Sequence, residues 1–209
     1  MPKLRWSSSD IGCQAMVDWI EEHYRKSEKS RLCFAIQGAS AVGKTTLAFQ
    51  IRSKLIENAE ISSWMVRRDL FIIKGPERRS FDFEAATVMQ GQLQDWQLHN
   101  KKADELLGCP LNLPRALEGN GIVLLDDMRN MPKLSIDGSI YLFRNVCELT
   151  RQEEARNGVS WPWWEHLRRR CSKFLLQRKL IGCAARSKIP SLVVHWNPYG
   201  ESTAWKLNE

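Results

Sequence analysis

One short segment limits what this chain can fold into more than any other feature. It runs from Gly38 to Thr46, reads GASAVGKTT and fits the pattern G-x-x-x-x-G-K-[ST]. A loop of this type joins a strand to a helix, and its glycines let successive backbone N–H groups face one anion. The flanks agree, because residues 32–37 form an apolar run typical of a buried strand and residues 45–58 carry apolar side chains at helical spacing. A turn that only linked the two elements would need neither Lys44 nor Thr45.

The loop predicts a site for a nucleoside triphosphate, with ATP and Mg²⁺ as the expected cofactors. Lys44 would reach the β- and γ-phosphates, and Thr45 would ligate Mg²⁺. The residues expected to bind the nucleotide are Gly38, Ala39, Ser40, Ala41, Val42, Gly43, Lys44, Thr45 and Thr46.

A second apolar run ends in two carboxylates. Residues 121–125 read GIVLL and are followed by Asp126 and Asp127, as in a Walker B strand. Functional groups gather at the carboxyl ends of strands in an open α/β sheet, so we expect both carboxylates beside the loop. We assign Asp126 to Mg²⁺ and Asp127 to catalysis, where it would orient a nucleophile. A strand followed by an aspartate-rich turn is the simpler alternative.

Composition favours one globular domain over residues 1–209. The chain has 209 residues, 43% of them hydrophobic, without a run of the ~20 apolar residues that a membrane span requires. We therefore expect a soluble, cytoplasmic protein that does not use a membrane. The six cysteines show no C-x-x-C pair and are expected to be reduced thiols rather than disulfides or zinc ligands. The net charge of +7 favours acidic partners such as nucleotides, nucleic acid or a phosphorylated small molecule.

The remaining pattern alternates strands with helices. Helices are predicted over 10–25 and 82–107, strands over 61–66, 139–143 and 191–195, a charged loop over 75–80, and a basic helical region over 148–179. This alternation predicts an α/β protein with the three-layer P-loop NTPase fold. We expect a mostly parallel five-stranded sheet, with a helical lid at approximately 148–180.

The order of elements resembles that of the P-loop nucleoside and metabolite kinases, in particular their uridine kinase-like branch. The resemblance spans roughly residues 32–196 and is most specific over Gly38–Thr46. It implies that Asp69, after the second strand, accepts the proton of a substrate hydroxyl. The segment SFDFEA at 80–85 is similar to the opening of the substrate-side helix in that branch. Asp69 could instead form a surface ion pair.

A third similarity lies in the lid. Residues 151–158 read RQEEARNG and precede the tryptophans of 161–164, as in small kinases whose lid carries Arg-x-x-x-x-Arg-Asp-Gly; here Asn157 stands where the aspartate is usual. The resemblance implies that Arg151 and Arg156 stabilise the negative charge on the moving phosphoryl group. A solvated basic helix face would show the same arginines.

These observations favour a kinase that transfers phosphate to a small-molecule hydroxyl, most simply on a nucleoside, a nucleotide or a related metabolite. A hydroxyl in nucleic acid is a variant of the same reaction, because the basic charge and the tryptophans suit a backbone and stacked bases. The competing class is a P-loop ATPase of motor, loader or switch type, which the pair Asp126-Asp127 also fits. A nucleotide-binding module without catalysis is a third class. The sequence does not identify the acceptor or the oligomeric state.

Overall fold

The computed structural model describes residues 3–67, 72–74, 79–81, 120–126 and 136–208. Its main feature is a seven-stranded sheet with the order β1-β9-β8-β7-β2-β6-β3. The strands are β1 (Lys3–Trp6), β2 (Arg31–Gly38), β3 (Ser63–Arg67), β6 (Gly121–Asp126), β7 (Gly138–Phe143), β8 (Ser191–His195) and β9 (Ser202–Leu207). A separate antiparallel pair consists of β4 (Ile72–Lys74) and β5 (Arg79–Phe81).

The centre of the sheet is parallel. β2 pairs in parallel with β6 on one side and β7 on the other, while β3 and β8 extend the parallel set. All but one residue of β2 and every residue of β6 are buried, as expected for strands covered on both faces. Because these strands share one direction, their carboxyl ends lie at the same edge of the sheet.

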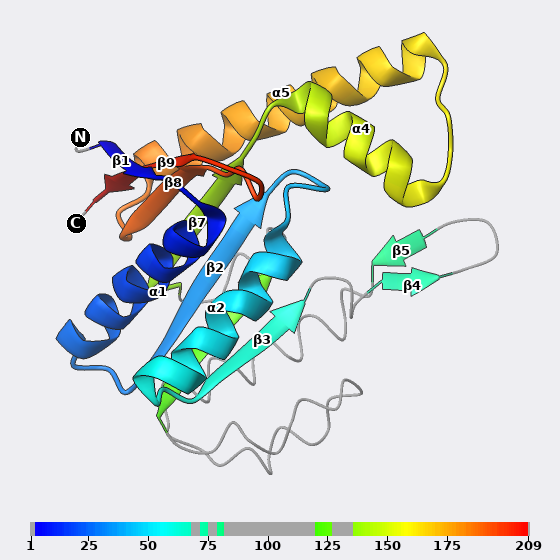
Figure 1. Ribbon diagram of the computed structural model, residues 1–209. Coiled ribbons are helices and arrows are strands. Elements are labelled where there is room, and N and C mark those ends of the chain that lie inside the picture. The colour runs from blue at the N-terminus through cyan, green and yellow to red at the C-terminus, as the bar shows by residue number, and fades with distance from the viewer. Residues whose placement is uncertain (1–2, 68–71, 75–78, 82–119, 127–135, 209) are drawn as a thin grey trace.

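Helices cover both faces of the sheet, which gives the three layers (Figure 1). On one face, α1 (Ser9–Lys26) packs against α2 (Lys44–Ala59), and α2 contacts β2, β3 and β6. On the other face, α5 (Trp163–Arg186) packs against β2, β7 and β8. A separate hydrophobic core lies on each face of the sheet. Successive side chains of β7 point to opposite faces, so Ile140 packs with residues of α1 and α2, whereas Tyr141 packs with residues of α5.

α4 (Val146–Asn157) follows β7 and forms a hairpin with α5. The Asn145 side chain caps α4 by accepting a hydrogen bond from the backbone N–H of Cys147 at 2.8 Å. Gly158 ends the helix with φ +63°, a left-handed conformation that favours glycine. Figure 1 shows this hairpin projecting beyond the carboxyl edge of the sheet.

The sheet differs from the sequence-based expectation in its strand count. Five strands were expected, and the five parallel ones lie where the apolar runs predict them. The two additional strands, β1 and β9, pair antiparallel with each other, and β9 also pairs antiparallel with β8. In β1 only Trp6 is buried, and β9 mixes buried with half-buried positions, so neither carries the continuous apolar run that marks the central strands. Their pairing brings the two ends of the chain together, which no local pattern indicates.

Two further expectations need comment. The charged loop expected over 75–80 is wrong at Arg79 and Ser80, because both belong to β5; residues 75–78 lie outside the described residues. The helix expected over 82–107 also lies outside them. In the described part of the chain, no helix is both long enough and apolar enough to cross a bilayer.

Candidate functional site

The loop between β2 and α2 has the backbone geometry of an anion cradle. Ala41 and Gly43 both adopt left-handed conformations, with φ values of +66° and +96°. At Gly38 the chain passes so close to β7 that a Cβ atom would lie 2.7 Å from the carbonyl oxygen of Leu142. Gly43 is the N-cap of α2 and has no side chain to satisfy the N–H groups of the first helical turn. Those donors and the positive end of the helix dipole therefore face the loop.

Lys44 begins α2 and lies across this loop. Its side chain is largely buried, and Nζ donates a hydrogen bond to the carbonyl oxygen of Ala39 at 3.1 Å. The ammonium group is thus held over the loop, where it would meet the β- and γ-phosphates of a bound nucleotide.

Thr45 and Asp126 are brought together from separate elements. Parallel pairing places Asp126, the last residue of β6, opposite Ile36 of β2. The Thr45 hydroxyl then donates to Oδ2 of Asp126 at 2.5 Å, and the carboxylate is buried. A hydroxyl beside a carboxylate suits Mg²⁺, which usually takes one or two protein ligands and completes its shell with phosphate oxygens and water. The described residues contain no cluster of three or more acidic, histidine or cysteine side chains that would hold a metal alone.

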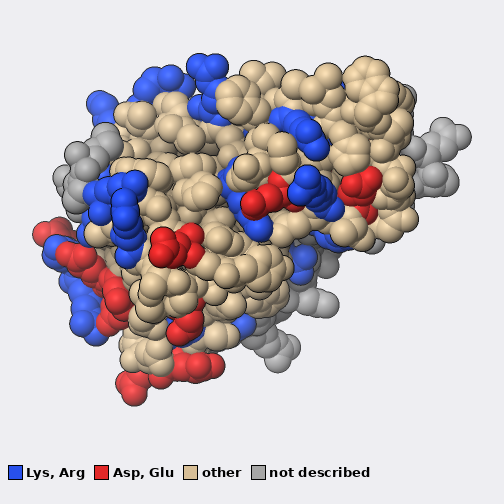
Figure 2. Space-filling model, turned by 45° about the horizontal axis from the view of Figure 1, so that its top comes forward, with Lys and Arg blue, Asp and Glu red and all other residues tan. Residues whose placement is uncertain are grey.

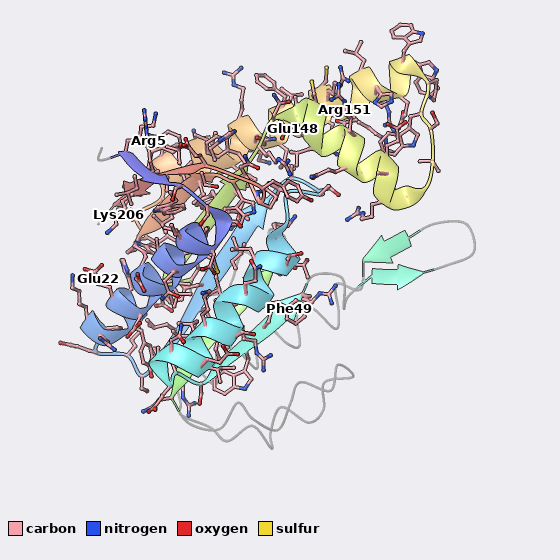
Figure 3. All side chains as sticks on the ribbon, viewed as in Figure 1. Arg5, Glu22, Phe49, Glu148, Arg151 and Lys206 are labelled. Carbon is pink, nitrogen blue, oxygen red and sulfur yellow. The ribbon has the colours of Figure 1, made fainter. Side chains whose placement is uncertain are left out.

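The α4–α5 hairpin supplies a cation to the same loop. Arg156, in the last turn of α4, lies with its guanidinium 3.4 Å from Oγ of Ser40, although 116 positions separate the two residues in the chain. Arg151 is exposed and makes no such contact with the loop within the described residues. Figure 3 labels Arg151 beside Glu148, nearer the start of α4. Of the two arginines expected to act from the lid, the structure brings only Arg156 to the loop.

Buried charges hold the hairpin together. Glu153 of α4 binds Lys173 of α5, and one of its carboxylate oxygens lies 3.3 Å from Arg169. The side chains of Glu153 and Lys173 are only 12% and 8% exposed. Burial by itself would raise the pKa of Glu153, but Lys173, Arg169 and Arg156 outweigh it, and the pKa lies below its usual value.

A second set of contacts closes the turn of the hairpin. Glu154 accepts a hydrogen bond from the backbone N–H of Trp161 at 2.8 Å and lies 3.2 Å from His166. The guanidinium of Arg169 stacks over the Trp161 ring at 3.9 Å. α4 and α5 are thus joined by charge and stacking contacts on both sides of residues 158–162. We expect the hairpin to move as one body, so that Arg156 is carried with it.

Two residues at the carboxyl edge were not predicted as site residues. Trp196, directly after β8, is buried, and its Nε1 would lie 3.5 Å from a Cβ atom at Gly43. Its ring therefore packs against the loop. Arg144, directly after β7, pairs with Glu148 at 2.7 Å and lies 5.8 Å from the ring centre of Tyr199. Both residues directly follow a parallel strand. A position at the carboxyl end of a strand is the signal that identified Asp126 in the sequence, and the same signal could have identified Trp196 and Arg144.

The two remaining predicted site residues, Asp69 and Asp127, lie outside the described residues. Arg67, which ends β3, lies opposite Asp126 in the strand register. Asp69 follows Arg67 by two positions in the sequence, and its role stays a prediction.

Of the comparisons with known proteins, the one with solved structures gives matches. No protein-family model matches the chain, and no curated protein matches it in sequence. Among solved structures, D-glycerate 3-kinase from Cryptococcus neoformans var. grubii matches with a TM-score of 0.54 at 12% identity, over 88% of this chain and 95% of that one. A possible uridine kinase from Bacillus stearothermophilus matches with a TM-score of 0.50 at 14% identity, over 87% of this chain and 98% of that one.

A candidate fructose transport system kinase from Silicibacter sp. TM1040 matches with a TM-score of 0.50 at 16% identity, over 82% of this chain and 94% of that one. At identities this low, the likeness shows the fold. The chain therefore has the fold of the uridine kinase-like P-loop kinases.

Proposed function

We propose that this chain is an ATP-dependent phosphotransferase that moves the γ-phosphoryl group to a hydroxyl of a nucleoside, a nucleotide or a related metabolite. The observation that carries the proposal is the contact between Arg156 and Ser40. A P-loop alone fits any nucleotide hydrolase. A basic side chain that reaches the loop from a helical hairpin of the same chain suits a kinase, which must neutralise the transferring group and exclude water.

Each residue then has a defined task. The backbone of 38–43 and Lys44 bind the phosphates, and Thr45 and Asp126 would hold Mg²⁺, which when bound neutralises charge on the β- and γ-phosphate oxygens. Arg156 stabilises charge on the equatorial oxygens during transfer. Because it belongs to the hairpin rather than to the sheet, this stabilisation depends on the position of the hairpin.

On the acceptor side, the resemblance to these kinases supports the roles of Asp69 and Arg151, and the position of Asp127 after an apolar run in the sequence supports its role. Asp69 would accept the proton of the attacking hydroxyl and leave it positioned for in-line attack. Asp127 would orient the nucleophile, and Arg151 would add charge if the hairpin closes further. A nucleoside-like acceptor fits the resemblance, and a hydroxyl in nucleic acid fits the net charge of +7.

An ATPase remains the second candidate because of one observation: Asp126 ends β6, and a second carboxylate, Asp127, follows it in the sequence. One would hold Mg²⁺ and the other would polarise a water molecule. The two candidates differ in what receives the phosphate.

The test is ADP formation by the purified chain, measured with and without a panel of nucleosides, nucleoside monophosphates, sugars and oligonucleotides. A kinase should form ADP slowly until one acceptor is added. ADP formation that is independent of every acceptor, and that rises with a polymer or with protein concentration, would support the ATPase.

A further inference from the structure

The outward face of α5 carries large apolar side chains along its length. The large exposed side chains on it are Trp163, Trp164, Leu167, Phe174, Leu175 and Ile181, here called the α5 stripe. At 100° per residue they fall within about 120° of the helix circumference. The opposite side of α5 faces α4 and the sheet through its buried residues Lys173, Gln177, Leu180 and Ala184. The α5 stripe therefore points away from the rest of the chain that the structure describes.

The exposed apolar area of this surface is comparable to the largest apolar patch of a typical monomer. Trp163, Trp164 and Phe174 are 77%, 56% and 51% exposed. With roughly 200 Å² for each aromatic side chain, these three alone expose roughly 370 Å². The largest apolar patch of a typical monomer covers about 300–600 Å², and the three aliphatic members add to the total. Patches of this size on monomers are often functional.

The charges beside the stripe are basic. Arg168, Arg178, Lys179 and Arg186 are the exposed charged residues of this helix. Its one acidic residue, Glu165, is buried and accepts hydrogen bonds from Arg168 and Arg169 at 2.7 Å and 2.6 Å. In Figure 2 the upper edge of the described surface shows blue and tan side chains without red ones. An occupant of the stripe should therefore carry acidic edges, and a second copy of this chain would bring basic edges together.

The residues along the centre of this face have the spacing of a helix-packing seam. Trp164, Leu167, Cys171, Phe174, Arg178 and Ile181 follow one another at alternating intervals of three and four residues. This is the spacing of a coiled-coil seam. Arg178 lies within the seam, with its guanidinium 5.8 Å from the ring centre of Phe174. In a seam with a second helix, this cation would pair with an acidic residue of the partner and fix the register.

We propose that the α5 stripe docks an amphipathic helix of another protein, one with an apolar seam and acidic flanks. The docking site lies on the far side of α5 from Lys173 and the buried charges, so the P-loop does not take part. The proposal does not depend on phosphoryl transfer. Its test needs only the folded protein and no assay of enzymatic activity.

The test uses two labelled helical peptides that share one leucine seam and differ only at the flanks, with glutamate in one and lysine in the other. Binding to the full chain is measured by fluorescence anisotropy at 0.15 M salt. We expect the glutamate peptide to bind at least tenfold more tightly than the lysine peptide. The double variant Leu167→Ser/Phe174→Ser should bind the glutamate peptide at least tenfold more weakly than the unaltered chain does. The variant Arg178→Glu should shift the binding preference toward the lysine peptide.

Phe49→Ser is the matched control, because Phe49 is 46% exposed on α2, away from α5 (Figure 3). It should leave binding unchanged, and circular dichroism should show that every variant is folded. Equal binding of the two peptides, or full binding by the double variant, would overturn the proposal. Two other results would also overturn it. One is self-association through the stripe, measured by sedimentation, and the other is binding of the stripe to phosphatidylserine vesicles in place of the peptide.

Discussion

Replacing Glu153 with glutamine should destabilise the hairpin, because the substitution removes the one carboxylate that binds Lys173 in the described structure. The Lys173 side chain is 8% exposed, so its ammonium group would remain largely buried with its charge uncompensated. Removing one partner of a buried ion pair costs about 3–5 kcal/mol. We expect about 3 kcal/mol, the lower end, because both side chains retain some contact with water. For a chain of this length, that corresponds to a fall in Tm of roughly 6–12 °C.

The double variant Glu153→Gln/Lys173→Met provides the matched control. It removes both charges and keeps the aliphatic stem of residue 173, so most of the lost stability should return. The assay is urea unfolding followed by tryptophan fluorescence, with the helical content checked by circular dichroism. The reasoning would be refuted if Glu153→Gln cost less than about 0.5 kcal/mol, or if the double variant were no more stable than the single one.

The same pair predicts a pH dependence with a definite sign. Because the pKa of Glu153 is lowered in the folded chain, its stabilising effect is complete above the unfolded-state pKa of about 4.3. The effect is lost as the pH falls through the lower folded-state pKa. As the pH is lowered from 6 into the acid range, the free energy of unfolding of the wild-type chain should therefore fall by more than that of Glu153→Gln. Parallel curves of unfolding free energy against pH for the two proteins would contradict this.

Four further predictions concern the loop and the reaction. Gly38→Ala should lower stability by about 1–3 kcal/mol in urea unfolding, since the added Cβ would lie 2.7 Å from a β7 carbonyl oxygen; unchanged stability would show that the close approach is wrong. Lys44→Ala should weaken ATP binding in calorimetry and abolish transfer, and full activity would remove the P-loop from the reaction. Arg156→Ala should lower kcat by about 10²-fold with a smaller change for Arg151→Ala, because only Arg156 contacts the loop in the described structure; an equal loss would point to a more closed hairpin. Asp69→Asn should slow transfer while ATP binding is preserved, and unchanged transfer would exclude Asp69 as the base.

The parts of the fold that could be read from the sequence are those with a local signal. β2 and β6 are continuous apolar runs, and the glycines and lysine of the loop follow a fixed spacing. The contact between Thr45 and Asp126 was then predictable, because parallel strands place their carboxyl ends together. β1 and β9 lack such a run, and their pairing depends on an encounter between the two ends of the chain.

The lid shows where sequence reasoning stops. Arg151 and Arg156 are equally basic, but five positions on a helix separate them by about 140°, so one cannot infer from spacing which of them faces the loop. That is decided by the packing of α4 on α5 through Glu153 and its partners. From the sequence, Trp196 was only one of several tryptophans suited to core packing or to base stacking, since nothing in its own neighbourhood indicates that Gly43 packs against it.

The measurement that tests the central claim most directly is transfer of label from γ-labelled ATP to an acceptor, with phosphate release followed in parallel and Lys44→Ala as the control. A kinase should place the label covalently on one class of hydroxyl acceptor, and the Lys44 variant should place none. Label that appears only as free phosphate, whichever acceptor is supplied, would contradict the kinase assignment and favour the ATPase.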